Sequence, residues 1–314
     1  MAYRFKLNES LTRGVRRIAL AQLALAEQRL KDTSDPVAAV HEVRKSLKRT
    51  RALLRLVRPA LGEPVYRREN TQLRDAGRLL SSARDTDVMR ETVTKLEARL
   101  ADDSRSCIGP LRELLNGTGK RAAGPAAPAG LRKAKVSIAA ARKRLARLKI
   151  GTDGFEPLAT GLQASYRRGR RALAQAEDGA DDEGFHELRK GVQQHWRQML
   201  LLSRAWPEVC RARAASAREI AQLLGEEHDY AVLTAFVASH HASGLTQEQL
   251  DVIAEACRVR QLQLRTLALP MARRLFADRA RPFARRMAKY WRLARDLARL
   301  ETGKAKPDKA SGDD

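Results

Sequence analysis

The sequence is poor in aromatic residues, in cysteine and in turn-forming residues. Aromatic side chains make up 4% of the 314 residues, and the chain has 19 Gly and 11 Pro, which argues against an all-β chain rich in turns. The three cysteines, Cys107, Cys210 and Cys257, are odd in number, widely separated and in no CxxC pair. A disulfide framework or a zinc site is therefore not expected, and a reducing compartment fits.

Long apolar runs are also missing. The longest, residues 18–26, is interrupted by Gln22 and is far shorter than the roughly 20 residues that a membrane span needs. Residues 1–10 carry charges and no apolar segment, so no signal peptide is visible. We therefore expect a soluble, cytoplasmic protein without a membrane partner.

Acidic residues are outnumbered by basic ones. The chain has 61 Lys and Arg against 37 Asp and Glu, a formal net charge of +24 and a pI of about 10.8. The excess positively charged side chains repel one another, and a polyanionic partner would reduce this repulsion. Most of the basic residues are Arg, whose planar guanidinium binds two phosphate oxygens at once.

Hydrophobic residues make up 43% of the chain, enough for a packed interior. They recur at spacings of three and four, as at Val43, Leu47 and Leu54, and no convincing alternating strand pattern is present, so the sequence predicts an all-α fold. Asp35-Pro36 predicts the start of one helix, which Pro59 and Gly62 end. Further helices are expected over residues 65–81, 87–101, 131–149, 157–176, 183–204, 207–224, 230–240, 247–265 and 282–300. Residues 116–130, rich in Gly, Ala and Pro, are expected to form a mobile connection between helices.

The chain repeats itself. The motif HEVRK at residues 41–45 recurs as HELRK at residues 186–190, an offset of 145. Further on, LLSSARDTDV at residues 79–88 matches LLGEEHDYAV at residues 223–232, an offset of 144. Two motifs in order at nearly constant spacing indicate a duplicated helical unit. We expect one bundle over residues 1–150, a second over residues 151–301 and a disordered tail over residues 302–314.

These paired motifs resemble the two repeats of the CHAD family, the conserved histidine α-helical domain, over about residues 7–300. The resemblance implies two four-helix bundles related by a pseudo-twofold axis, with basic helices lining a central groove or pore that binds inorganic polyphosphate. It also implies a link to polyphosphate metabolism and granules. Many relatives carry a triphosphate-tunnel (CYTH) domain as well, for which this chain has no room. The second repeat departs from the first because Gln193, Gln194 and Trp196 stand where Lys48, Arg49 and Arg51 stand.

The first motif helix carries an unmixed basic stripe. At about 100° per residue, His41 and six Arg and Lys residues between Arg44 and Arg58 fall within an arc of roughly 140° and a length of about 25 Å. The N-terminal half is also the more basic, with 34 Lys and Arg against 15 acids in residues 1–150, compared with 27 against 22 in residues 151–314. The predicted polyphosphate contacts are His41, Arg44, Lys45, Lys48, Arg51, Arg55, Arg74, Arg78, Arg84, His186, Arg189, Lys190, Arg197, Arg218 and His228. Further candidates on the first helix of each half are Arg16, Arg17, Arg167, Arg168, Arg170 and Arg171.

The motif histidines and aspartates have two interpretations each. His41 and His186 either contact phosphate or fill a bundle seam, and surrounding cations should lower their pKa. Asp85 and Asp229 are predicted N-caps of following helices, or they orient Arg74 and Arg218 across the bundle.

The predicted function is non-catalytic binding of polyphosphate, without a metal or cofactor. Nucleic-acid backbone binding is one alternative, since a basic groove binds any regular polyanion. A metal-dependent phosphohydrolase is another, with His186, His228, Asp229 and Asp251 as ligands. Arg84, the repeat equivalent of His228, argues against a metal because it cannot ligate one. Oligomeric state is not predicted.

Overall fold

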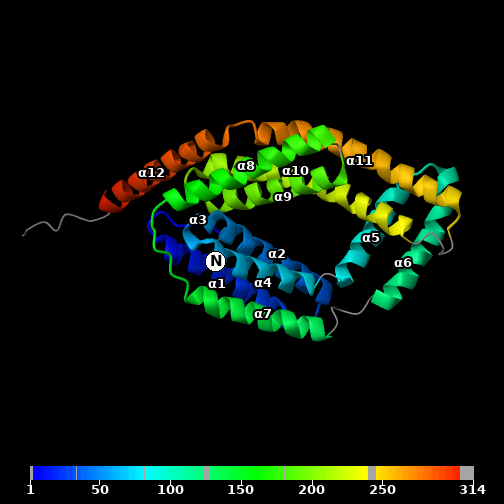
Figure 1. Ribbon diagram of the computed structural model, residues 1–314, viewed down its shortest axis with the longest axis horizontal. Helices are drawn as coiled ribbons and strands as arrows, with labels where there is room; N and C mark the ends of the chain where they lie inside the picture. The colour runs from blue at the N-terminus through cyan, green and yellow to red at the C-terminus, as the bar shows by residue number, and fades with distance from the viewer. Residues whose placement is uncertain are drawn as a thin grey trace, which may run out of the picture.

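The computed structural model describes residues 3–32, 34–80, 82–122, 128–179, 181–239 and 245–304. Within these residues the protein is helical and contains no strand (Figure 1), which confirms the predicted all-α class. None of the described helices is long and apolar enough to cross a membrane. The elements in chain order are α1 (Leu11–Arg29), α2 (Pro36–Leu56), α3 (Arg58–Leu61), α4 (Glu63–Arg78), α5 (Ser82–Glu97), the 3-10 helix η1 (Asp102–Cys107), α6 (Ile108–Ala122), α7 (Pro128–Ala146), α8 (Glu156–Gly179), α9 (Asp182–Leu201), α10 (Pro207–Ala238), α11 (Gln247–Leu275) and α12 (Ala280–Lys304).

The helix starts follow local sequence signals. Asp35 caps α2 by accepting a hydrogen bond from the Ala38 backbone N–H, with Pro36 in the first turn, as predicted. Asp181 caps α9 in the same way, through the Gly184 N–H. Such caps satisfy backbone donors that have no partner within the helix.

The two halves share one apolar core. Helices α1, α2, α4 and α7 pack on one another, α8 packs on α9 and α12, and α9 packs on α10. Their buried residues, from Val43 and Leu54 to Leu162 and Leu188, belong to a single cluster. The chain passes from α7 to α8 at the expected boundary, but the core does not divide there, so the two-domain division stays a prediction.

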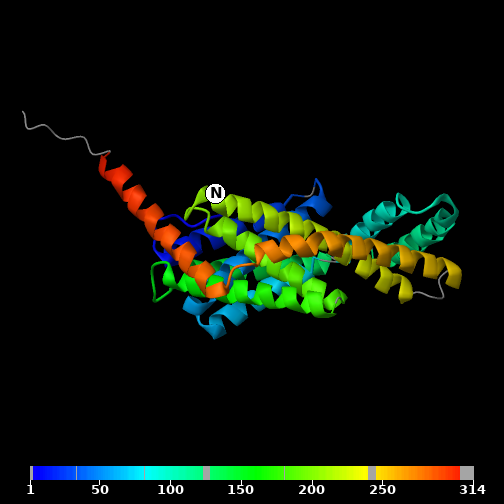
Figure 2. The same ribbon diagram turned by 90° about the horizontal axis from the view of Figure 1, so that it is seen from above.

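A second, smaller core, here called the distal core, lies at the end of the molecule opposite α12, where α5 and α6 meet α10 and α11 (Figure 2). It joins Val93 of α5 and Leu115 of α6 to Leu233 of α10 and Leu264 of α11. A helical hairpin of the first half is therefore packed against the second half.

Glycines permit the close helix contacts between and within the halves. A Cβ at Gly161 of α8 would lie 1.7 Å from the Leu56 carbonyl oxygen at the end of α2. A Cβ at Gly191 of α9 would lie 2.9 Å from the Gly169 Cα of α8. Any larger residue at these two positions would push the helices apart.

One predicted break in the second half is wrong. Residues 207–224 and 230–240 were expected as separate helices, but α10 runs unbroken through Gly225, and Asp229 lies inside it. The predicted N-cap role of Asp229 is therefore wrong. Asp85 likewise lies inside α5, which begins at Ser82. Packing of Tyr230 and Leu233 in the distal core favours the continuous helix.

The helix expected over residues 247–265 is longer than predicted, because α11 continues through Pro270 to Leu275.

The predicted connection at residues 116–130 is wrong over most of its length. Helix α6 extends to Ala122 and α7 begins at Pro128. Residues 123–127, between them, lie outside the described residues. Of the predicted tail, residues 302–304 belong to α12 and residues 305–314 lie outside the described part.

Candidate anion-binding site

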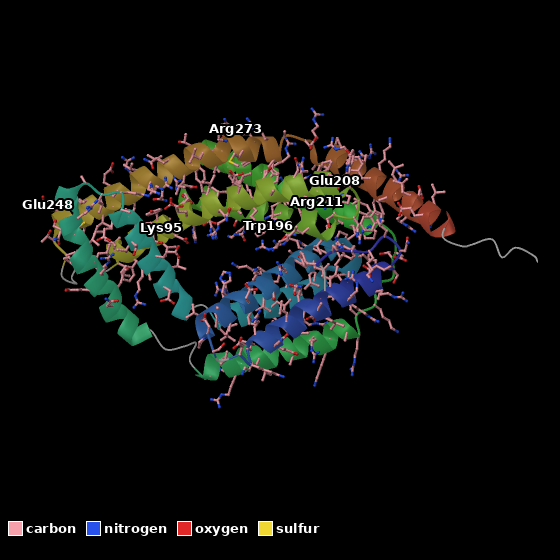
Figure 3. All side chains as sticks on the ribbon, turned by 180° about the vertical axis from the view of Figure 1, so that it is seen from behind. Lys95, Trp196, Glu208, Arg211, Glu248 and Arg273 are labelled. Atoms are coloured by element: carbon pink, nitrogen blue, oxygen red, sulfur yellow. The ribbon has the colours of Figure 1, made fainter. Side chains whose placement is uncertain are left out.

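A pocket of about 570 Å³ lies between the two motif helices. Helices α2 and α9 touch near Ala52 and Gln194 and diverge toward their N-terminal ends (Figure 1), where α5 and α10 close the opening. Figure 3 shows this region from behind, surrounded by α2, by α5 with its labelled Lys95 and by α9 with its labelled Trp196. Eight Arg and Lys side chains line the pocket, against one carboxylate, that of Asp229.

The first wall is the predicted basic face of α2. Arg44, Lys48, Arg51 and Arg55 line the pocket from this helix. Arg51 Nε donates to Asn70 Oδ1 at 3.0 Å, and Arg55 Nη1 donates to Gln194 Oε1 at 3.2 Å. Among the described residues, no carboxylate lies within 4.0 Å of the Arg51 or Arg55 guanidinium. These hydrogen bonds therefore fix two cations in place without neutralising them.

The second wall comes from α9 and α8. It presents Arg189, Lys190 and Arg197 of α9, together with Arg168 of α8. Arg168 Nη2 lies 3.1 Å from a carboxylate oxygen of Glu187, which also pairs with Lys190. Two of the four cations of this wall are thus partly neutralised by Glu187.

Crowding of the guanidiniums has an electrostatic cost. Burial, and then the nearby Arg55, Arg74 and Arg78 charges, lower the pKa of Arg51 to about 10. Burial, and then neighbours that include Arg49, lower the pKa of Arg197 to about 10 as well. Both side chains stay charged at neutral pH, and a bound anion would offset the repulsion between them.

Two histidines stack at the divergent end of the pocket. The rings of His186 and His228 lie 4.5 Å apart, at 29°. Burial, followed by the Arg189 charge, lowers the pKa of His228 to about 4, and burial followed by Lys190 lowers that of His186. Both rings are therefore neutral at pH 7, which was expected for His186 and not predicted for His228. The His186 Nδ1 is buried without a hydrogen-bond partner among the described residues.

Nine of the fifteen predicted contacts line the pocket: Arg44, Lys48, Arg51, Arg55, His186, Arg189, Lys190, Arg197 and His228. His41, Lys45, Arg74, Arg78 and Arg218 do not line it. Lys45 pairs with Glu42 and Arg74 with Asp75. The side chain of Asp85 lies outside the described residues, so its contact with Arg74 stays a prediction. The side chain of Arg84 lies outside the described residues.

Several lining residues were not predicted from the sequence. Arg168 was one of six undecided candidates, and the other five do not line the pocket. Gln194 was noted only as a departure from the repeat, yet it bridges the walls, because its Nε2 donates to the Ala52 carbonyl oxygen at 3.2 Å. Val88 and Met89 of α5 and Val232 of α10 add an apolar rim. Val88 and Val232 end the two copies of the second motif, and Met89 follows the first copy, but none of the three was predicted to line a site.

A metal site was one alternative interpretation of the motif histidines. No group of three or more His, Cys, Asp or Glu side chains in the described part of the chain lies in a position to hold an ion. His186, His228 and Asp229 do lie near one another at the pocket, and Asp251 does not line it. The structure thus brings three of the four alternative ligands to one place without forming such a group.

Comparison with known proteins places these helices in a family. A model of the CHAD domain matches residues 15–238. Among solved structures, the chain is similar in fold to PptA from Streptomyces chartreusis, at 17% sequence identity and a TM-score of 0.58, over 86% of this chain and 98% of that chain. A search of the curated proteins found no match. The family model spans well over half of the chain and includes both motif helices, so the chain belongs to the CHAD domain family.

Proposed function

We propose that this protein binds inorganic polyphosphate in the pocket between α2 and α9, without hydrolysing it. The observation that carries the proposal is the lining itself, in which eight Arg and Lys side chains meet a single carboxylate. Guanidinium groups bind phosphate oxygens in pairs, and each neutralised phosphate releases counterions. The ligand supplies the negative charge that this lining lacks.

The shape of the pocket favours a chain over a compact anion. Along α2, Arg44 and Arg55 are eleven residues apart, about 16 Å at a rise of 1.5 Å per residue. Orthophosphate can reach only a few of the cations spaced along this length. A linear polyphosphate presents a charge to each of them in turn.

A nucleic-acid backbone fits the pocket less well. The described lining contains no Phe, Tyr or Trp on which bases could stack, and stacking supplies much of the affinity for single strands. A duplex would have to bring its phosphates into a recess between two helices. Polyphosphate has no bases, so neither constraint applies to it.

The proposed role is non-catalytic and linked to polyphosphate storage or metabolism in the cytoplasm. The two histidines are neutral at pH 7 and stack on each other, which suits hydrogen bonding to phosphate. No metal or cofactor has a part in this mechanism.

The test compares three triple variants that each remove three positive charges. The first changes Arg44, Lys48 and Arg51 to Gln, the second changes Arg168, Arg189 and Lys190 to Gln, and the control changes the exposed Arg285, Lys289 and Arg292 of α12 to Gln. Binding of long-chain polyphosphate is measured by isothermal titration calorimetry, and circular dichroism checks that each variant is helical. The first triple should weaken binding about 100-fold, from roughly 1 kcal/mol or more per charge-assisted contact, and more than the second, since two cations of the second wall already share Glu187.

Other results would contradict the proposal in different ways. Equal small losses in all three variants would mean that net charge, not the pocket, holds the ligand. Duplex DNA or RNA that displaces polyphosphate, instead of the reverse, would favour nucleic acid. Phosphate release in the presence of Mg²⁺ or Mn²⁺ that disappears in His228→Ala would show an enzyme.

A further inference from the structure

A second region without acidic residues lies outside the pocket. Residues 114–152 contain ten Lys and Arg and no Asp or Glu. Five of the 15 lysines in the whole chain lie in this stretch: Lys120, Lys133, Lys135, Lys143 and Lys149. The bias toward lysine is notable in a protein whose other cations are mostly arginine.

Helix α7 places these charges on its outer side. Ala134, Ile138, Ala141 and Leu145 are fully buried against the N-terminal bundle, where α7 packs on α1 and α4. The opposite side is exposed and carries four cations of α7, with a fifth, Arg147, directly after the end of the helix; together they form the α7 outer face: Arg132, Lys133, Lys135, Lys143 and Arg147.

The cations of the α7 outer face lack acidic partners. Arg142 pairs with Glu27 of α1 at 3.1 Å, and Arg144 pairs with Glu69 of α4 at 2.8 Å. Both pairs lie at the flanks of α7, where it meets its neighbours. No carboxylate of the described residues forms an ion pair with any of the five outer cations. Like charges three and four residues apart on a helix destabilise it, and a bound polyanion would remove that effect.

The α7 outer face is separate from the pocket. The pocket is lined from α2, α5, α8, α9 and α10, with no residue of α7. In Figure 1, α7 forms the lower edge of the molecule, with α1, α2 and α4 between it and α9. A short anion held in the pocket therefore leaves the α7 outer face free.

We propose that the α7 outer face binds a second polyphosphate chain, so that one protein molecule bridges two chains. This inference rests on the proposed function of the pocket. Three of the five cations of the α7 outer face are lysines. A lysine carries a strongly hydrated point charge on a flexible side chain, which suits weak and exchangeable contacts on a convex surface. Val136, 70% exposed, is its single large apolar side chain, and α7 has no aromatic residue. Insertion into a lipid surface and stacking of bases are therefore poorly supported.

A two-chain capture assay tests the bridging. Short polyphosphate is attached sparsely to a surface and loaded with protein, the surface is washed, and a fluorescently labelled polyphosphate is then added. The wild-type protein should retain the labelled chain. The variant Lys133→Gln, Lys135→Gln, Lys143→Gln should load equally but retain about eightfold less labelled chain, because each exposed contact contributes roughly twofold.

The control and the alternative outcomes separate this inference from the proposed function. The α12 triple described above removes the same charge and should capture the second chain as the wild type does. Equal losses in the two triples, or no loss in the α7 triple, would overturn the bridging by the α7 outer face. Preferential capture of labelled duplex DNA would make that face a nucleic-acid site instead. Failure of the wild-type protein to load on the first chain would contradict the proposed function.

Discussion

His195 is a residue whose burial has a measurable cost. Its ring is 2% exposed and lies among Tyr166, Phe276 and Phe283, with ring centroids 5.5–5.8 Å away. Neither ring nitrogen has a hydrogen-bond partner in the described structure. Burial, and then the Arg213 charge, lower the pKa of His195 to about 3.

Replacing His195 should reduce the dependence of the free energy of unfolding on pH. Between pH 6.5 and about 3 the unfolded chain carries a proton on this side chain and the folded protein does not. The free energy of unfolding therefore falls as the pH falls through that window, by up to about 1.4 kcal/mol per pH unit from this group. His195→Phe removes this contribution, so the variant should lose less stability than the wild type as the pH falls. Urea unfolding at several pH values measures the slopes, and identical slopes for His195→Phe and wild type would contradict the prediction.

At the level of single helices, the two copies of the second motif differ. Helix α4 ends at Arg78 and α5 begins at Ser82, whereas α10 runs without a break through the equivalent part of the second half. As a result, Asp229 lies in the middle of a helix and faces the pocket. Asp181, by contrast, is a true N-cap, with its Oδ1 2.7 Å from the Gly184 backbone nitrogen.

This difference predicts unequal effects of two similar substitutions. Asp181→Ala should lower the free energy of unfolding by about 1 kcal/mol, because the start of α9 loses its cap. Asp229→Ala should cost much less, since no helix begins there, and it should strengthen polyphosphate binding by removing the one carboxylate of the pocket. Denaturant unfolding and calorimetric titration of both variants check this. A loss of stability in Asp229→Ala as large as that in Asp181→Ala would mean that Asp229 has a structural role.

The repeat made much of the site predictable from sequence. Arg44 and Arg189 occupy equivalent positions and both line the pocket, because the duplication places one basic face of each motif helix toward the other. Arg168 could not be separated from its neighbours Arg167, Arg170 and Arg171, since only the rotation of α8 against α9 decides which one faces inward. The continuity of α10 could not be predicted from the sequence either. Gly225 locally favours the end of a helix, but the packing of Tyr230 and Leu233 in the distal core stabilises a continuous α10.

The charge of the whole molecule should govern its response to salt. With a net charge of +24, the folded protein repels itself, and salt shortens the range of that repulsion from about 10 Å at 0.1 M to about 3 Å at 1 M. We expect the melting temperature to rise by a few degrees over this range, while polyphosphate affinity falls steeply. Differential scanning calorimetry measures the first and titration at several NaCl concentrations the second. A melting temperature that falls with salt would show that the surface ion pairs outweigh the repulsion.

The shared distal core also constrains how the protein is made. Leu115 of α6 leaves the ribosome roughly 150 residues before Leu264 of α11, a delay of about 7–30 s at about 5–20 residues per second. Helix α10, which adds Tyr230 and Leu233 to the same core, is made during that interval; until then Val93, Leu96 and Leu111, all buried in the finished protein, have no partner outside the hairpin of α5 and α6. The nascent chain therefore presents an apolar hairpin that is uncovered until α10 is made and incompletely covered until α11 follows, and this hairpin is the segment on which a chaperone would act.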